Sequence, residues 1–213
     1  MDFLVDGSPG DPTYLFAHGA GAAMDSAGMT ALASRIAARG IRVVRFEFGY
    51  LAGRRQGVRR PPPRADTLLD EFRAVVAEVG SDGAVPVIGG RSMGGRVASM
   101  VADELFAAGA IAGLACLSYP WHPPARPDQP RVAHLLGMRT PTLVVQGTRD
   151  PFGTPDEVAG YGLPATIDLL WLEDGDHDLR PRKAVSGFTV AQHLDAGADA
   201  VGDFVRRVTK VER

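Results

Sequence analysis

The sequence predicts an α/β fold with a mostly parallel, doubly wound sheet and helices on both of its faces. Short apolar runs rich in β-forming residues alternate with longer helical patterns, as in repeated strand–helix–strand units. Most of these runs are continuous rather than alternating, which is typical of strands buried on both faces of a parallel sheet. Right-handed crossovers would then place helices on both sides.

Six apolar runs are predicted strands, at residues 14–17, 41–46, 85–89, 113–119, 142–146 and 166–172. Five helical patterns lie between and after them, near residues 25–39, 65–79, 93–108, 130–138 and 189–208. The apolar residues of the last pattern fall roughly on one helical face, which indicates a helix packed against the sheet.

Two segments are predicted to be rigid loops rather than helices or strands. Residues 49–64 contain three consecutive prolines, and residues 120–130 contain five prolines. Proline fixes φ and removes a backbone donor, so it disfavours regular structure. Each segment follows a predicted strand, and loops at the carboxyl ends of such strands form the ligand crevice. Both segments are therefore candidate pocket walls.

The composition excludes several classes of protein. The 213 residues are 45% hydrophobic and 23% charged, as in a globular protein, and we expect one domain over residues 1–213. A net charge of -2 gives no overall attraction to nucleic acid or to an anionic membrane. The single cysteine excludes an intrachain disulfide. Without a signal-peptide pattern or a membrane-length apolar run, we expect a cytoplasmic protein.

The strongest functional motif is G-R-S-M-G at residues 90–94, which fits G-x-S-x-G. It lies between a predicted strand and an apolar helical run, which is the setting of a nucleophile elbow. The glycines permit a sharp turn that exposes the serine, and the helix N-terminus favours developing negative charge. We predict that Ser92 is a nucleophile. The alternative is a glycine–serine turn without chemistry.

A nucleophilic serine needs a base, and the base needs an orienting acid. Asp150 follows the fifth predicted strand and His177 follows the sixth. With Ser92 they occur in the chain order serine, aspartate, histidine that this arrangement requires. We predict that the three form a catalytic triad. The alternatives are a turn-forming aspartate before Pro151 and a solvated acidic loop around the histidine.

Three aspartates flank His177 and raise the alternative of a metal site. They are Asp174, Asp176 and Asp178. Their run lacks the full spacing of an EF-hand loop, so we expect no metal. No cofactor is implied either, because a triad supplies nucleophile, base and charge stabilisation itself. The two remaining histidines of the helical patterns, His134 and His193, are predicted surface or capping residues.

The loop after the first predicted strand consists of His18 and a run of small residues. Such a loop can supply one N–H donor of an oxyanion hole, beside the N–H of the residue after the nucleophile. We assign these donors to Ala20 and Met93, with Gly21 as the alternative in the loop. The histidine is predicted to hold this loop rather than to act as a base.

Further residues are candidates for the substrate pocket, His18 and Gly21 among them. If the first proline-rich segment borders the site, Arg54 and Arg55 would attract an anionic substrate, and a solvated basic loop is the alternative. In the second segment, Trp121 and His122 would form a short pocket wall. The tryptophan is equally well explained by packing.

Several segments resemble the α/β-hydrolase superfamily, namely residues 16–22, 45–48, 90–95, 118–120, 122–124 and 146–153. More narrowly, they resemble the small-hydrolase family that also contains the testis-expressed protein 30 and a subunit of the non-specific-lethal acetyltransferase complex. The resemblance extends from about residue 14 to His177. It implies an α/β-hydrolase fold with minimal or no lid domain, and the chain keeps the superfamily's triad.

The expected chemistry is acyl transfer to water, in which His177 takes the proton of Ser92 and Asp150 holds the imidazole tautomer. The expected partner is a small ester-like molecule, with thioesters and amides also open, and neither nucleic acid nor a membrane. Alternatives are a non-catalytic binding or scaffold module, a peptidase of the same fold, or transfer to another alcohol. A protein partner or homo-oligomer stays open.

Overall fold

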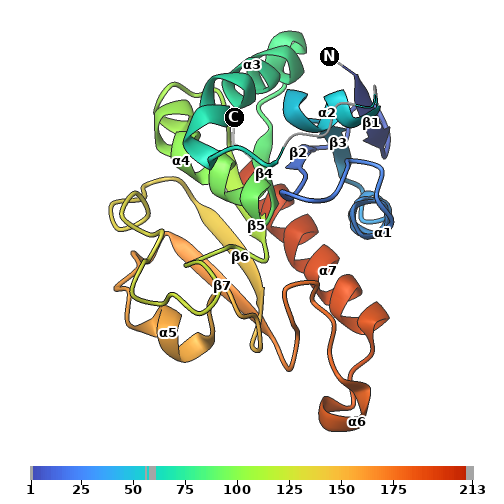
Figure 1. The fold of residues 1–213 in the computed structure, drawn as a ribbon. Helices are drawn as coiled ribbons and strands as arrows, with labels where there is room; N and C mark the ends of the chain where they lie inside the picture. Colours follow the sequence, from blue (N-terminus) through green and yellow to red (C-terminus); the bar gives the residue numbers. More distant parts are fainter. Residues whose placement is uncertain (1, 56, 58–60, 210–213) are drawn as a thin grey trace.

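A sheet of seven strands runs through the computed structural model, which describes residues 2–55, 57 and 61–209 (Figure 1). The strands are β1 (Phe3–Asp6), β2 (Thr13–Ala17), β3 (Arg42–Phe46), β4 (Val87–Arg91), β5 (Gly113–Leu117), β6 (Thr142–Gly147) and β7 (Ile167–Leu172). Their spatial order is β1-β3-β2-β4-β5-β6-β7, and every pair is parallel except β1 with β3. This topology confirms the predicted fold class.

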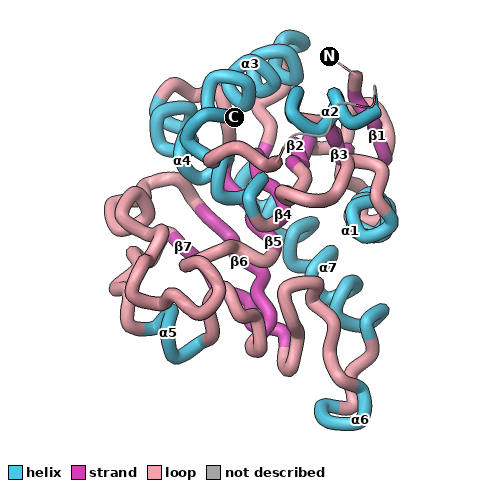
Figure 2. The backbone as a smooth tube through the Cα atoms, in the orientation of Figure 1, coloured by secondary structure: helices cyan, strands magenta, loops and turns pink. Residues whose placement is uncertain are grey.

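The helices in the described part of the chain are α1 (Ala27–Ala37), α2 (Gly49–Arg55), α3 (Leu69–Val79), α4 (Met93–Ala107), α5 (Pro155–Ala159), α6 (Lys183–Ser186) and α7 (Val190–Thr209). Figure 2 shows α3 and α4 on one side of the sheet and α1 and α7 on the other. None of these described helices has both the length and the apolar composition needed to cross a lipid bilayer.

The two faces of the sheet carry separate hydrophobic cores. Leu15 of β2 belongs to the core that includes Phe72 of α3, whereas its neighbour Phe16 belongs to the core that includes Leu32 of α1 and Phe204 of α7. Successive side chains of a strand point to opposite faces, so both must be apolar when both faces are covered. This explains the continuous apolar runs of the sequence.

All six predicted strands are present, and their bounds differ by one or two residues. β5 ends at Leu117, before the predicted end, where Ser118 adopts a left-handed φ of 55°. The edge strand β1 escapes sequence prediction because it has four residues and none of them is buried. Only its antiparallel partner β3 identifies it as a strand.

The prediction of a rigid loop over residues 49–64 is wrong for its first part, which forms α2. This helix is anchored at its start, since the backbone N–H groups of Leu51 and Ala52 donate to the carbonyl of buried Phe48. The carboxylate of Glu71 in α3 also accepts from the N–H of Gly49, with a distance of 2.6 Å. Residues 61–64, with their prolines, are irregular as predicted.

The predicted helix over residues 130–138 is also wrong, because this segment consists of turns. Its apolar residues Val132, Leu135 and Met138 recur every third position and are buried. The backbone N–H of Leu135 donates to the carbonyl of Val132, and that of Met138 donates to the carbonyl of Leu135, so the three residues lie in two successive turns. Apolar residues at every third position can therefore belong to successive turns packed on the core. In the sequence alone, this spacing is easily taken for that of a helix.

The short helix α5 is absent from the predicted elements, although the sequence contains signals of its start. Thr154 and Glu157 form a capping box, and Pro155 occupies the first turn. Both features mark helix starts, since they satisfy or remove the backbone donors that a helix N-terminus leaves unpaired. The hydrophobic pattern misses this helix because it has only five residues.

The start of α4 passes very close to the end of β2. A Cβ atom added to Gly94 would lie 2.5 Å from the carbonyl oxygen of His18 and 2.7 Å from that of Ala17. A Cβ atom added to Gly90 would likewise lie 2.7 Å from the latter oxygen. Both glycines are therefore required by backbone packing, because no side chain fits between these two segments.

We expect Gly94→Ala to lower the free energy of unfolding by about 1–3 kcal/mol or more, because its methyl group overlaps two backbone carbonyls. Denaturation in urea measures this change. Gly137→Ala is the matched control, since no atom lies within 4 Å of the added Cβ. Equal stabilities of the two variants would contradict the close approach.

A second prediction concerns His134, whose Nε2 lies 2.8 Å from Oγ of Ser99 in α4. Burial and then the charge of Arg96 lower its pKa to about 4, although Asp103 opposes the shift. The unfolded chain therefore binds the proton more readily, and stability falls as the pH drops from about 6.5 to 4.

Replacing His134 with Gln is expected to remove about 2 kcal/mol of this acid-induced loss, allowing for partial solvent screening. The measurement is the free energy of unfolding at pH 4.5 and at pH 7.5 for both proteins. If the variant lost as much stability as the wild type over this interval, the histidine would not be responsible.

Candidate active site

Ser92 occupies the turn between β4 and α4 with φ 50° and ψ -118°. Residues other than glycine rarely adopt a positive φ, so the surrounding structure must hold the backbone of Ser92 there. The backbone N–H of Ser92 donates to the carbonyl of Leu117 at 2.9 Å, which fixes the turn to the end of β5. The serine side chain therefore projects from the carboxyl edge of the sheet, as the motif predicts.

The structure brings Ser92 together with the other two residues of the predicted triad. Nε2 of His177 lies 2.9 Å from Oγ of the serine. Nδ1 of the same ring lies 2.9 Å and 3.1 Å from the two carboxylate oxygens of Asp150. The three groups form a continuous hydrogen-bonded chain, although 85 residues separate the serine from the histidine.

Asp150 is fully buried, and its carboxylate has further donors. Nε2 of Gln146 donates to one oxygen at 2.7 Å, and the backbone N–H of Phe152 donates to the other at 2.9 Å. A buried carboxylate needs such donors, since it has left water. They also fix its plane, so that both oxygens face the histidine. Gln146, at the end of β6, was missed by the sequence analysis.

Two residues, Phe152 and Arg91, position the loop that carries His177. The ring of Phe152 packs on the imidazole, with 4.2 Å between ring centroids. Arg91, beside the serine in the motif, donates to the histidine's backbone carbonyl at 3.2 Å and pairs with Asp178. The arginine thus joins the serine turn to the histidine loop. An arginine within the motif and an acid beside the histidine were the available sequence signals.

The aspartates around the histidine serve as hydrogen-bond acceptors within the loop. Asp174 accepts from the backbone N–H and the guanidinium of Arg182, and these bonds hold its pKa well below the usual range. Asp176 accepts from the backbone N–H groups of Asp178 and Arg180, both at 2.9 Å. Across the described residues, no group of three or more potential ligands is placed to hold a metal ion.

Ala20 and Met93, the predicted oxyanion donors, line the same pocket as the serine. The hydroxyl of Tyr50 donates to the carbonyl of Ala20 at 3.0 Å and so positions this loop. His18 lies beneath it, fully buried, and its Nε2 accepts from the backbone N–H of Phe48 at 3.1 Å. Burial lowers the pKa of His18, which keeps the ring neutral as this acceptor role requires.

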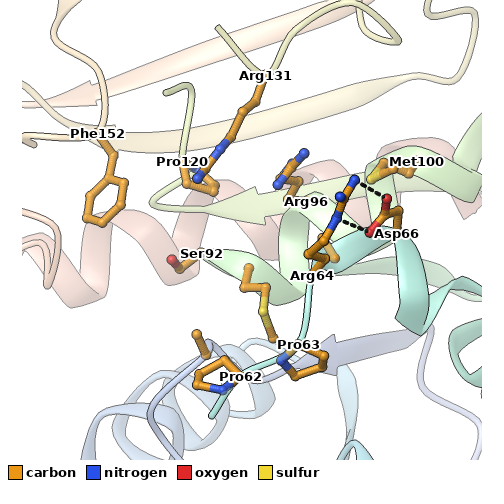
Figure 3. Close-up of a pocket in the computed structure, with 13 residues that line it drawn as sticks. Pro62, Pro63, Arg64, Asp66, Ser92, Arg96, Met100, Pro120, Arg131 and Phe152 are labelled. Carbon is orange, nitrogen blue, oxygen red and sulfur yellow. Dashed lines mark hydrogen bonds and ion pairs between the residues drawn. The ribbon is translucent and has the colours of Figure 1, made fainter. Parts of the chain in front are cut away.

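A pocket of about 390 Å³ opens beside the serine (Figure 3). It is lined by Ala20, Pro62, Pro63, Arg64, Ala65, Asp66, Ser92, Met93, Arg96, Met100, Pro120, Arg131 and Phe152. Prolines from both predicted loop segments contribute to this wall, in agreement with the sequence analysis. Gly21 and His18 are not among the lining residues, so their candidate pocket role is not supported.

The predicted pocket wall of Trp121 and His122 is wrong, because both side chains are buried outside the pocket. The tryptophan ring packs on Tyr119, with 4.8 Å between centroids. The histidine Nε2 lies 3.3 Å from a carboxylate oxygen of Glu157. After Pro120 the chain turns into the core, so only that proline faces the pocket.

Arg54 and Arg55 belong to α2, but their side chains lie outside the part of the chain that the structure describes. Their binding of an anionic substrate stays a prediction. His193, predicted to lie on the surface, is instead buried on the inner face of α7, where Nδ1 lies 3.1 Å from the carbonyl of Leu179. Its helical position faces the sheet, which explains the difference.

Known proteins share this architecture. The model of the alpha/beta hydrolase domain family matches residues 10–206. An alpha-beta serine hydrolase homologue from Coxiella burnetii has a TM-score of 0.70 and 18% identity, covering 97% of this chain and 91% of that chain. A Xanthomonas campestris protein, described as a serine hydrolase without a lid, has a TM-score of 0.67 and 22% identity, covering 100% and 91%.

A third structure holds ferulic acid bound to Est1E from Butyrivibrio proteoclasticus, with a TM-score of 0.70 and 15% identity, covering 97% of this chain and 94% of that one. Identities this low establish a shared fold. The family model, by contrast, matches nearly the whole chain. The chain therefore belongs to the alpha/beta hydrolase domain family.

Proposed function

We propose that the protein is a serine hydrolase that cleaves a small ester, or a related thioester or amide, through an acyl-enzyme. One observation carries the proposal, namely the hydrogen-bonded chain from Asp150 through His177 to Ser92 beside a pocket. A buried carboxylate, an imidazole bonded on both nitrogens and a serine on a strained turn are the components that activate a hydroxyl for attack.

In the proposed reaction, the Ser92 oxygen attacks the substrate carbonyl carbon while its proton passes to Nε2 of His177. Asp150 accepts the Nδ1–H bond, which selects the reactive tautomer and stabilises the imidazolium. The imidazolium then protonates the leaving alcohol, thiol or amine as the bond to it breaks. Water, deprotonated by the same nitrogen, attacks the acyl-enzyme; the carboxylic acid is released as the imidazolium returns the proton to the Ser92 oxygen.

The carbonyl oxygen becomes negatively charged in both steps, so it needs donors near the serine. We assign the backbone N–H of Met93, in the first turn of α4, and that of Ala20 in the loop held by Tyr50. Both residues line the pocket, and the positive end of the helix dipole adds to the stabilisation.

The names of two similar structures agree with this chemistry. The Coxiella protein is described as a serine hydrolase homologue, and Est1E was solved with ferulic acid, a small carboxylic acid. We extend the class, and no particular substrate, to this chain. The narrower relation to the small hydrolases that include testis-expressed protein 30 is likewise proposed, on the segments quoted above.

Replacing Ser92 with Ala is expected to lower kcat for 4-nitrophenyl butyrate by at least about 10⁴-fold, because the attacking oxygen is lost. Release of 4-nitrophenol measures the rate. The matched control is Ser99→Ala, since this buried serine on the same helix contacts His134 rather than the catalytic histidine. Turnover that survives in the first variant, with the fold intact, would contradict the proposal.

Asp150→Asn is expected to reduce kcat by about 10³–10⁴-fold, because an amide that donates to Nδ1 favours the wrong imidazole tautomer. The shape of the side chain is retained, so the folded state can be checked by thermal unfolding. Asp156→Asn, a change at an exposed aspartate of α5, serves as the control. A loss of less than about tenfold at Asp150 would show that the carboxylate does not orient the base.

A further inference from the structure

Two arginines line the pocket beside Ser92 without a counterion. Arg96 lies in α4, four residues and therefore about 6 Å along the helix axis from the serine. Arg131 follows the second proline-rich segment and enters the same pocket. Figure 3 shows its guanidinium beside Pro120, next to that of Arg96. Both side chains are partly buried, so water reaches them only in part.

Neither guanidinium forms an ion pair with a described residue. Nε of Arg96 is buried without a hydrogen-bond partner. The dashed bonds of Figure 3 join only Arg64 with Asp66, at 2.7 Å and 3.1 Å. That aspartate is the one acid among the lining residues; its carboxylate is hydrogen-bonded to Arg64 and acts on Arg96 only through space. Two positive charges therefore remain in excess within this pocket lining.

The proximity of the two cations has an electrostatic cost. Burial lowers the pKa of Arg131, and the neighbouring charge of Arg96 lowers it further. Like charges in a partly dry pocket repel each other more strongly than they do in water. Arginine stays protonated in proteins, so an anion is the means of relieving this repulsion.

Most arginines elsewhere in the described residues have acidic partners, although Arg42 and Arg126 form no ion pair. Arg35 pairs with Asp195, Arg73 with Glu104, Arg91 with Asp178, Arg182 with Asp174 and Arg207 with Asp168. The pocket lining thus carries three arginines and one aspartate, and this excess of positive charge is the pattern expected of a site whose counterion is the ligand.

We propose that Arg96 and Arg131 bind an anionic end of the substrate, a carboxylate or a phosphate, so that the hydrolysed acyl group carries a terminal negative charge. This deepens the proposed function and rests on it. The two guanidinium groups then supply charge-assisted hydrogen bonds to the anion, while the ester carbonyl lies at Ser92.

The position of the histidine assigns the anion to the acyl part rather than to the leaving group. The leaving group accepts its proton from His177, whose ring packs on Phe152. In Figure 3 Arg96 lies on the other side of the serine from Phe152, so the leaving group departs away from this arginine. Met93 and Pro120 border the intervening space and fit a short apolar spacer.

The test compares 4-nitrophenyl hydrogen adipate with 4-nitrophenyl methyl adipate, which differ only in the charged end. A third ester of similar length ends in a phosphate and separates the two anionic chemistries. For the wild type we expect kcat/KM to be about tenfold or more higher for at least one anionic ester than for the neutral ester. The carboxylate and phosphate rates then identify the preferred end.

Arg96→Gln and Arg131→Gln are each expected to lower kcat/KM about 10- to 100-fold for the anionic ester and less than about threefold for the neutral one. Arg96→Lys keeps the charge and is expected to recover part of the preference. Arg126→Gln, at an exposed arginine outside the pocket lining, is the matched control and is expected to leave the ratio unchanged.

Equal rates for charged and neutral esters in the wild type, or a ratio unchanged by both pocket variants, would overturn this inference while leaving the hydrolase intact. If neither ester is cleaved, the proposed function fails, and calorimetry with adipate and inorganic phosphate then decides about the anion site. Binding to the Ser92→Ala protein that is lost on adding Arg96→Gln would support the site. Absence of binding would overturn it.

Discussion

The backbone contact between the serine turn and the neighbouring strand is the constraint on which the site depends. Gly90 and Gly94 let the first turn of α4 approach the carbonyls at the end of β2 to a distance that excludes any side chain. This approach holds Ser92 at a φ of 50° above the sheet edge. It also sets the loop of Ala20, which we propose supplies an oxyanion donor, beside the helix N-terminus, because that loop continues directly from β2.

Charge is distributed unevenly around this turn. On the histidine side, acids and arginines satisfy each other, as in the pair of Arg91 with Asp178 that joins the serine turn to the histidine loop. On the pocket side, the charges of Arg96 and Arg131 act on each other, and neither side chain forms an ion pair with a described residue. The paired charges hold the serine turn and the histidine loop in position. The unpaired positive charges are available to bind an anionic ligand.

The fold and the three central residues were predictable because both follow local rules. Buried strands are continuous apolar runs, and Ser92, Asp150 and His177 each follow a strand in a required order. The pocket was less predictable, since Trp121 turns into the core and Arg96 looks in the sequence like any helix-surface arginine. The segment around Leu135 was predicted to be a helix because apolar residues at every third position occur both in helices and in successive turns. Side-chain direction after a loop depends on tertiary packing, which local patterns do not encode.

The central claim is that Ser92 is an activated nucleophile, and its most direct test is labelling of the purified protein with a neutral fluorophosphonate. The readout is intact mass followed by peptide mapping. We predict one adduct per chain, located on Ser92 and absent from the Ser92→Ala protein. A well-folded protein that remains unlabelled, or an adduct on another residue, would contradict the account and favour a binding role for this fold.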